Sequence, residues 1–205
     1  MKSDRFFIVA LILLLGTAYL LTLLPGVGGF GDTAKFQFVG FVLGTPHATG
    51  FPGYIFLNYF FTTLFPFGTL AYKANLLSAL FSVLSAIVLF RTLRLLDISR
   101  WITWISTLTF GLSFTFWSQS LMANVYTLHT LLTITTIFFF LHWQRNGKEL
   151  SFYCGVLFYA LSFGNHLMSI TLLPAIVYLV WITDRRAYWN AKKIAFILTL
   201  VLLSA

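Results

Sequence analysis

Residues 54–65 read Tyr-Ile-Phe-Leu-Asn-Tyr-Phe-Phe-Thr-Thr-Leu-Phe, and the length of this apolar segment decides how the rest of the chain is arranged. As an α-helix the segment would be about 18 Å long. The hydrocarbon core of a membrane is about 30 Å thick and needs about 20 helical residues to cross it. We therefore predict that this segment lies on the membrane surface as a helix that ends before Pro66.

The composition around this segment is typical of a polytopic helical membrane protein. Of the 205 residues, 59% are hydrophobic and 9% are charged, and the mean hydropathy is +0.90. A soluble domain could not bury so much apolar surface. A β-barrel would show alternating polarity in short segments, whereas the apolar runs here are continuous. We expect an all-α polytopic membrane protein of about seven transmembrane helices, with two interfacial helices in its first outer loop.

Further apolar runs of suitable length recur along the chain. The predicted spans are residues 6–24, 70–93, 101–117, 125–143, 151–163 and 167–182, with a seventh starting near residue 194. The run 151–163 is short, so we expect it to include flanking residues. The first run is 19 residues long, which exceeds the apolar core of an ordinary signal peptide, so we interpret it as an uncleaved helix. We expect residues 1–205 to form one transmembrane domain that is incomplete at its C-terminal end.

The basic residues orient this arrangement. If residues 54–65 stay on the surface, 11 of the 13 Lys and Arg residues lie on the inner side, and only Lys35 and Lys73 lie outside. If the segment crosses, the distribution becomes 3 inside and 10 outside. Because basic residues favour the cytoplasmic side, we predict a cytoplasmic N-terminus and an outer or lumenal loop over residues 25–69. The membrane would be a bacterial plasma membrane or the endoplasmic reticulum. The net charge of +8 then reflects topology, and we expect no nucleic-acid partner.

Polar side chains gather at the predicted outer ends of the spans. The candidate residues among them are Asp32, His47, Lys73, Asn75, Asn124 and His166. Polar groups at membrane depth are costly, and they tend to line cavities or pathways. Since these residues lie on one side of the predicted membrane, they favour a pocket open to the outer face over a channel. Asp32 is the strongest candidate for chemistry, because it is the only acidic residue between Asp4 and Asp97.

Structural roles remain open for the same residues. Asp32 is also a favoured residue type for capping a helix that starts at Thr33. His47 could be solvated in its Pro/Gly turn, Asn75 could bond between helices, and Lys73 could anchor the chain at the interface. No metal motif, P-loop, dinucleotide fingerprint or Gly-x-Ser-x-Gly elbow occurs in the sequence. We therefore expect no metal cofactor.

Five local patterns occur in order over roughly residues 1–180. They are Gly31-Asp32, His47-Ala-Thr-Gly-Phe-Pro-Gly-Tyr54, Asn75-Leu-Leu-Ser-Ala-Leu-Phe81, Phe116-Trp-Ser-Gln-Ser-Leu-Met-Ala-Asn-Val-Tyr-Thr-Leu128 and Gly164-Asn-His-Leu167. An inner N-terminus, one span, and an outer loop with an early Asp and two surface helices resemble the GT-C superfamily of glycosyltransferases. Within it the five patterns make the chain similar to the protein O-mannosyltransferase-like family, formerly described as a domain of unknown function.

The chain departs from the family pattern at three places. No second acidic residue follows Asp32, Ala48-Thr49 stands where the pattern has Pro-Pro, and Asn124 stands where the pattern tends to have Glu. The loss of a carboxylate at position 124 argues against an acid-base or metal role for that residue.

The resemblance implies a GT-C-like fold and a membrane glycosyltransferase. Such an enzyme would move a sugar, expected to be mannose, from a polyprenyl-phosphate donor to a Ser or Thr hydroxyl of a protein on the outer or lumenal side. Asp32 would be the catalytic base. The expected substrate-binding residues are His47, Lys73, Asn75, Asn124, Tyr126 and His166. The expected partners are membrane lipid, the lipid-linked sugar, and an acceptor protein or glycan.

Two other classes of function stay open at this stage. One is a transporter or flippase for a lipid-linked sugar, which would place polar groups and broken helices at the middle of the bilayer. The predicted spans carry Ser and Thr at mid-depth but no charge, which weighs against a transporter. The other is a non-catalytic membrane scaffold.

Overall fold

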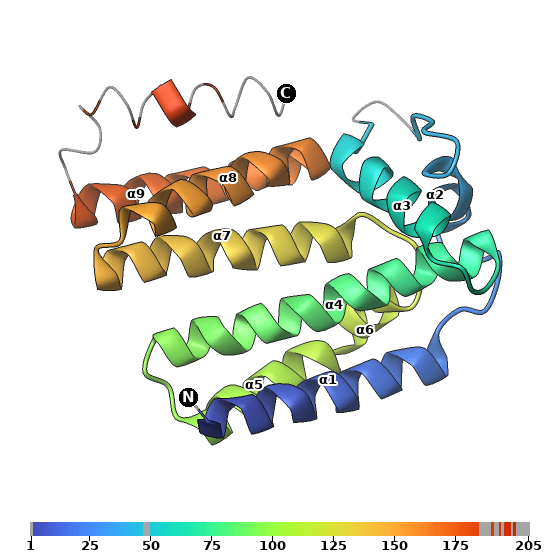
Figure 1. The fold of residues 1–205 in the computed structure, drawn as a ribbon, viewed down its shortest axis with the longest axis horizontal. Coiled ribbons are helices and arrows are strands. Elements are labelled where there is room, and N and C mark those ends of the chain that lie inside the picture. The colour runs from blue at the N-terminus through green and yellow to red at the C-terminus, as the bar shows by residue number, and fades with distance from the viewer. Residues whose placement is uncertain are drawn as a thin grey trace.

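The structure is a computed structural model that describes residues 2–46 and 50–184, together with residues 190, 193, 195–197 and 199. Within these residues every regular element is a helix, as predicted. Figure 1 shows the long helices lying side by side as a bundle, with α2 (Thr33–Val39) and α3 (Pro52–Leu64) packed across one end. We call this end of the bundle the α2–α3 end.

The bundle helices run back and forth between its two ends (Figure 1). They are α1 (Lys2–Thr22), α4 (Leu70–Leu95), α5 (Arg100–Gly111), α6 (Phe114–Ser120), α7 (Tyr126–Asn146), α8 (Glu149–Asn165), the 3-10 helix η1 (Leu167–Leu172) and α9 (Leu173–Thr183). Among the described residues, Asp4–Thr22 and Leu70–Leu95 are long and apolar enough to cross a membrane. The total of seven spans stays a prediction, and most of the predicted seventh lies outside the described residues.

The predicted third span, residues 101–117, is divided into α5 and α6 just after Gly111. At this point α1 lies very close. The Tyr19 hydroxyl donates to the Gly111 carbonyl at 2.8 Å, and a Cβ on Gly111 would come within 2.8 Å of Leu15. The last carbonyls of a helix need partners from outside it. Tyr19 supplies one of these partners, and Ser113 then stands at the N-cap of α6.

The predicted sixth span, residues 167–182, also changes form along its length. It begins as the 3-10 helix η1 and becomes α-helical in α9. Pro174 lies in the first turn of α9. A proline is tolerated there because its missing N–H is not needed, whereas its ring would clash inside one continuous α-helix.

The helix α2 is short, and its apolar face packs on protein. The spacing of the sequence predicts that Phe36 and Val39 share one face of an interfacial helix with Leu43. Both are instead buried, and Phe36 contacts the ring of Tyr54 in α3 at 5.4 Å. Leu43 lies beyond the helix in a turn with φ 50° and is exposed. The prediction that Leu43 belongs to the helical face was therefore wrong.

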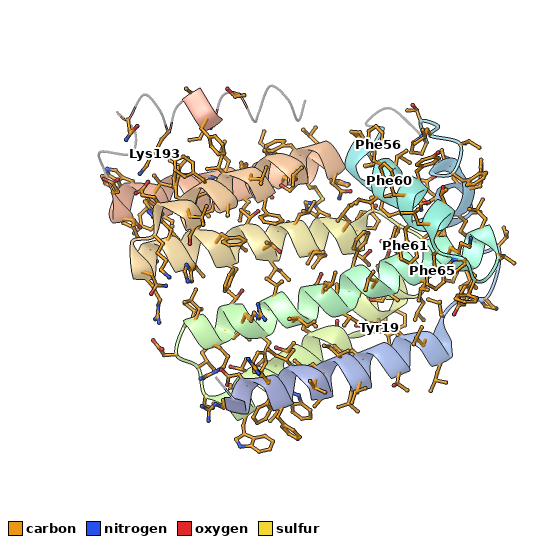
Figure 2. The ribbon with its side chains drawn as sticks, in the orientation of Figure 1. Tyr19, Phe56, Phe60, Phe61, Phe65 and Lys193 are labelled. Atoms are coloured by element: carbon orange, nitrogen blue, oxygen red, sulfur yellow. The ribbon has the colours of Figure 1, made fainter. Side chains whose placement is uncertain are left out.

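The segment that opened the sequence analysis forms α3, and its predicted end before Pro66 is confirmed. Phe65 is extended, with φ −76° and ψ 120°, as expected for a residue that precedes proline. Phe56 and Phe60 on its outer face are each 56% exposed, whereas Phe61 and Phe65 stack at 5.3 Å (Figure 2). Such an exposed aromatic face suits contact with lipid, which stays a prediction.

An ion-pair cluster lies at the opposite end of the bundle. The Lys193 ammonium is nearly buried, 3.0 Å from Glu149 and 3.5 Å from Asp184 (Figure 2). It also lies 4.8 Å from the ring centre of Phe152. Lys193 therefore joins the C-terminal residues to α8 and α9, far from the α2–α3 end.

We predict that Gly40→Ala loosens the contact between α2 and α3. A Cβ on Gly40 would come within 2.7 Å of the Asn58 Cβ, and that side chain is held by a bond to the Phe36 carbonyl. Overpacking of this kind costs about 1–3 kcal/mol, which should lower the Tm measured in detergent. Gly16→Ala is the matched control, because nothing lies within 4 Å of its new Cβ. An equal Tm for both variants would contradict the contact.

Candidate functional site

A pocket of about 550 Å³ opens at the α2–α3 end of the bundle. The segment after α1, the start of α2, the turn between α6 and α7, and the start of η1 form its walls. The lining residues are Phe30, Gly31, Asp32, Thr33, Phe36, Phe51, Gln119, Met122, Asn124, Val125, Tyr126 and His166. The fold thus brings together four residues that the sequence singled out, namely Asp32, Asn124, Tyr126 and His166.

Asp32 stands directly before α2, where the sequence placed it. Its side chain makes no capping hydrogen bond to the helix backbone. The carboxylate instead accepts from the Lys35 ammonium at 2.9 Å, and the side chain is 49% exposed. Gly31 before it has φ 59°, a left-handed conformation that glycine adopts without strain. The carboxylate therefore lines the pocket next to a compensating cation.

Asn124 shapes the opposite wall of the pocket. Its side-chain oxygen accepts from the backbone N–H groups of Tyr126 and Thr127 at 3.0 and 3.2 Å, which caps the start of α7. Its amide nitrogen donates to the carbonyls of Met122, at 2.8 Å, and Gln119. An amide has both donors and acceptors, whereas a carboxylate only accepts. The turn therefore uses both halves of the amide, and a carboxylate at this position could not donate to the two carbonyls.

His166 forms the aromatic part of the wall. Its ring centre lies 5.6 Å from that of Phe51, 5.8 Å from that of Tyr126 and 5.3 Å from that of His129. Its Nδ1 accepts from the backbone N–H of Met168 at 3.1 Å. A ring nitrogen that accepts carries no proton, so this hydrogen bond leaves Nε2 as the ring nitrogen that can donate.

Asn75 and Lys73 lie outside this pocket. Asn75 is fully buried, and its amide donates to the Leu24 carbonyl at 2.8 Å. The Lys73 ammonium donates to the Thr62 carbonyl at 3.0 Å, close to the end of α3, where the helix dipole favours a cation. Both contacts favour structural roles over substrate binding for these two residues. His47 lies outside the described residues.

Sequence reasoning missed several residues of the site. Phe36 and Phe51 line the pocket through their rings, which contact each other at 5.7 Å. Gln37 lies behind the wall, is 1% exposed, and bonds to the segment that precedes Asp32. Its one signal in the sequence is an amide between two phenylalanines, Phe36 and Phe38, in an otherwise apolar stretch.

Tyr54 supports the same wall from α3. Its hydroxyl accepts from the Asn58 amide at 3.3 Å, and burial raises the pKa of Tyr54 to about 12. Tyr54 is therefore a neutral phenol at physiological pH. Among the described residues, no group of three or more His, Cys, Asp or Glu side chains is placed to hold a metal ion.

Comparison with known proteins identifies the family. Residues 32–189 match the model of the protein O-mannosyl-transferase TMEM260 N-terminal domain. The chain belongs to this family. The matched region begins at Asp32 and includes all four candidate residues that line the pocket. No solved structure matches the chain.

Two relatives of the TMEM260 N-terminal domain family are similar to this chain. Protein O-mannosyl-transferase tmem260 of Dictyostelium discoideum is 25% identical over 207 residues, which covers 93% of the chain and 25% of that relative. Protein O-mannosyl-transferase TMEM260 of Mus musculus is 33% identical over 123 residues, 60% of the chain and 17% of the relative. The chain therefore spans about a quarter or less of the length of these relatives.

We predict that Asn124→Ala destabilises the turn that forms one wall of the pocket. Loss of a helix cap costs about 1 kcal/mol, and the carbonyl partners of the amide are lost as well. The control is Asn146→Ala at the far end of the same helix, where the exposed side chain bonds only to its own helix; it should change stability by less than about 0.5 kcal/mol. Thermal unfolding in detergent measures both. Equal stability of the two variants would show that Asn124 does not cap α7.

Proposed function

We propose that this chain is the site-bearing part of a membrane glycosyltransferase. It would transfer mannose from a polyprenyl-phosphate donor to a Ser or Thr hydroxyl of a protein, on the outer or lumenal side of a multi-pass membrane domain. The named relatives support mannosyl transfer to protein. The observation that carries the proposal is the placement of the Asp32 carboxylate in one pocket with Asn124, Tyr126 and His166.

The chemistry of the donor explains why one carboxylate is enough. The bond between the anomeric carbon and the phosphate oxygen breaks, and its electron pair leaves with the phosphate, which is a stable anion. The acceptor oxygen forms the new bond to the anomeric carbon and gives up its proton. Asp32 accepts this proton as the general base. A second carboxylic acid to protonate the leaving group is not required.

The cation beside the pocket suits the phosphate of the donor. The Lys35 ammonium lies 2.9 Å from the Asp32 carboxylate, whereas the Lys73 ammonium bonds to the Thr62 carbonyl outside the pocket. We therefore assign the charge-compensating role to Lys35 in place of Lys73. Cations near a developing phosphate anion stabilise it electrostatically. His47, which lies outside the described residues, stays a candidate for substrate binding.

The aromatic wall suits the sugar. Phe51, Tyr126 and His166 present ring surfaces to the pocket, and the Nε2–H of His166 adds a hydrogen-bond donor. Binding sites for small molecules are commonly lined by aromatic side chains with a few polar groups that fix orientation. A hexose has apolar C–H faces and hydroxyl edges, which match these two kinds of group.

We predict that Asp32→Asn abolishes transfer while the chain still inserts into membranes. Removal of a general base lowers the rate by about 10²- to 10⁴-fold, and the amide keeps the size of the side chain. The measurement is transfer of labelled mannose from polyprenyl-phosphate mannose to an acceptor peptide in proteoliposomes. The control is Asp97→Asn, which changes an exposed aspartate, paired with Arg145, at the other end of the bundle.

The same preparation separates the proposed enzyme from the other classes of function. Undiminished transfer by Asp32→Asn would contradict the catalytic role of Asp32. Movement of the intact donor across the bilayer without transfer would favour a transporter. Donor binding without turnover by the unmodified protein would favour a scaffold.

A further inference from the structure

We propose that Gln37 and Asn75 are positioning residues for the transfer reaction. Together they hold the Asp32 segment at a fixed place relative to the Asn124 turn, so that the two walls of the pocket keep their spacing. This inference rests on the proposed function, in which Asp32 is the base. The two side chains themselves do not line the pocket.

Gln37 binds the segment between α1 and α2 with its whole amide. Its oxygen accepts from the backbone N–H of Gly28 at 3.1 Å. Its nitrogen is 3.2 Å from the carbonyls of Gly26 and Gly28 and 3.0 Å from the Asn75 side-chain oxygen. The side chain is almost completely buried. Buried amide bonds of this kind are strong because water does not compete for them.

Asn75 joins that segment to the opposite wall through a single oxygen. Its Oδ1 accepts from Gln37 on one side and from the backbone N–H of Ala123 on the other, the second at 2.8 Å. Ala123 directly precedes Asn124. The side-chain nitrogen of Asn75 donates to the Leu24 carbonyl at 2.8 Å, where the segment leaves α1. From α4, the buried Asn75 side chain therefore bonds to both chain segments that continue into the walls of the pocket, behind the residues that line it.

Among the described residues, few other contacts hold the middle of the segment. Val27 and Phe30 are 80% and 82% exposed, so apolar packing does not fix it. Gly28 and Gly29 have positive φ values, 150° and 107°, which glycine adopts freely. Ordering each residue of such a chain costs about 1–2 kcal/mol of conformational entropy. Beyond the amide pair, bonds hold the two ends of the segment: the Leu24 N–H donates to the Leu121 carbonyl at 3.1 Å, and the Thr33 hydroxyl donates to the Phe30 carbonyl at 2.7 Å.

The position of Asp32 depends on this segment because Asp32 directly follows it in the chain and stands before the first residue of α2. A catalytic group that is misplaced by about 1 Å can lose about 10²-fold in rate. Loosening the amide pair should therefore slow the chemical step more than it weakens donor binding. Binding of the donor depends on the aromatic wall, which Gln37 does not touch.

The test uses Gln37→Met, which keeps the length of the side chain and removes its hydrogen bonds. We expect kcat to fall by about tenfold or more, while the KM for polyprenyl-phosphate mannose changes by less than about threefold. Hydrogen exchange should become faster in residues 24–36 and stay unchanged in residues 80–95. The control is Ser85→Ala, a buried side chain of α4 that bonds only to the Phe81 carbonyl. It should leave both measurements close to those of the unmodified protein.

Each other outcome overturns the proposal or part of it. Faster exchange in both regions would show general destabilisation and no positioning role. Faster exchange in residues 24–36 with an unchanged kcat would show that the segment is held but that its position does not matter. If the unmodified protein shows no transfer, the proposed function fails. Hydrogen exchange in Gln37→Met then still tests the structural part of the proposal: an unchanged rate in residues 24–36 would show that Gln37 and Asn75 do not hold this segment. If Gln37→Met does not fold, Gln37→Asn keeps the amide but shortens its reach, and an unaltered kcat in that variant would contradict the proposal.

Discussion

The side-chain oxygen of Asn75 accepts two hydrogen bonds, one from Gln37 and one from the backbone of Ala123, and the architecture of the α2–α3 end depends on this shared acceptor. Apolar helices pack with little specificity for the loops between them, because dispersion forces do not distinguish one loop conformation from another. Buried amides do distinguish loop conformations, because a displaced loop would leave their donors and acceptors without partners at a substantial energetic cost. The polar residues of this end therefore specify the loops, while the apolar residues form the bundle.

One end of α4 acts as the platform for the whole arrangement. Lys73 binds the last turn of α3, Asn75 binds the segment before Asp32, and the Ser78 hydroxyl accepts from the Asn124 backbone at 3.3 Å. These three residues lie within the first nine positions of the helix. A single rigid helix thus sets the relative positions of α3, the Asp32 segment and the turn before α7. Our proposed enzyme uses that rigidity to keep a base, a cation and an aromatic wall around one pocket.

Local rules in the sequence predicted much of this fold, and tertiary contacts account for the rest. The end of α3 before Pro66 follows from backbone chemistry that a few residues determine. The start of α2 at Thr33 agrees with the sequence, although the Asp32 side chain makes no cap bond there. The break after Gly111 does not, because it depends on a tyrosine from α1 that lies 92 residues away. The same holds for the site: Asp32 and His166 stood out as polar residues at predicted outer ends, whereas the role of Gln37 appears only when its partners from α4 are placed beside it.

In the proposed enzyme the reacting end of a lipid-linked sugar occupies the pocket beside Asp32. Photo-crosslinking tests this placement most directly, with a polyprenyl-phosphate mannose analogue that carries a diazirine on the sugar, followed by mapping of the labelled peptides. We expect label in residues 30–36, in residues 119–126 or at His166, and competition by unmodified donor. Label confined to the far end of the bundle, around residues 94–100 and 145–149, or to the exposed face of α3, would contradict it.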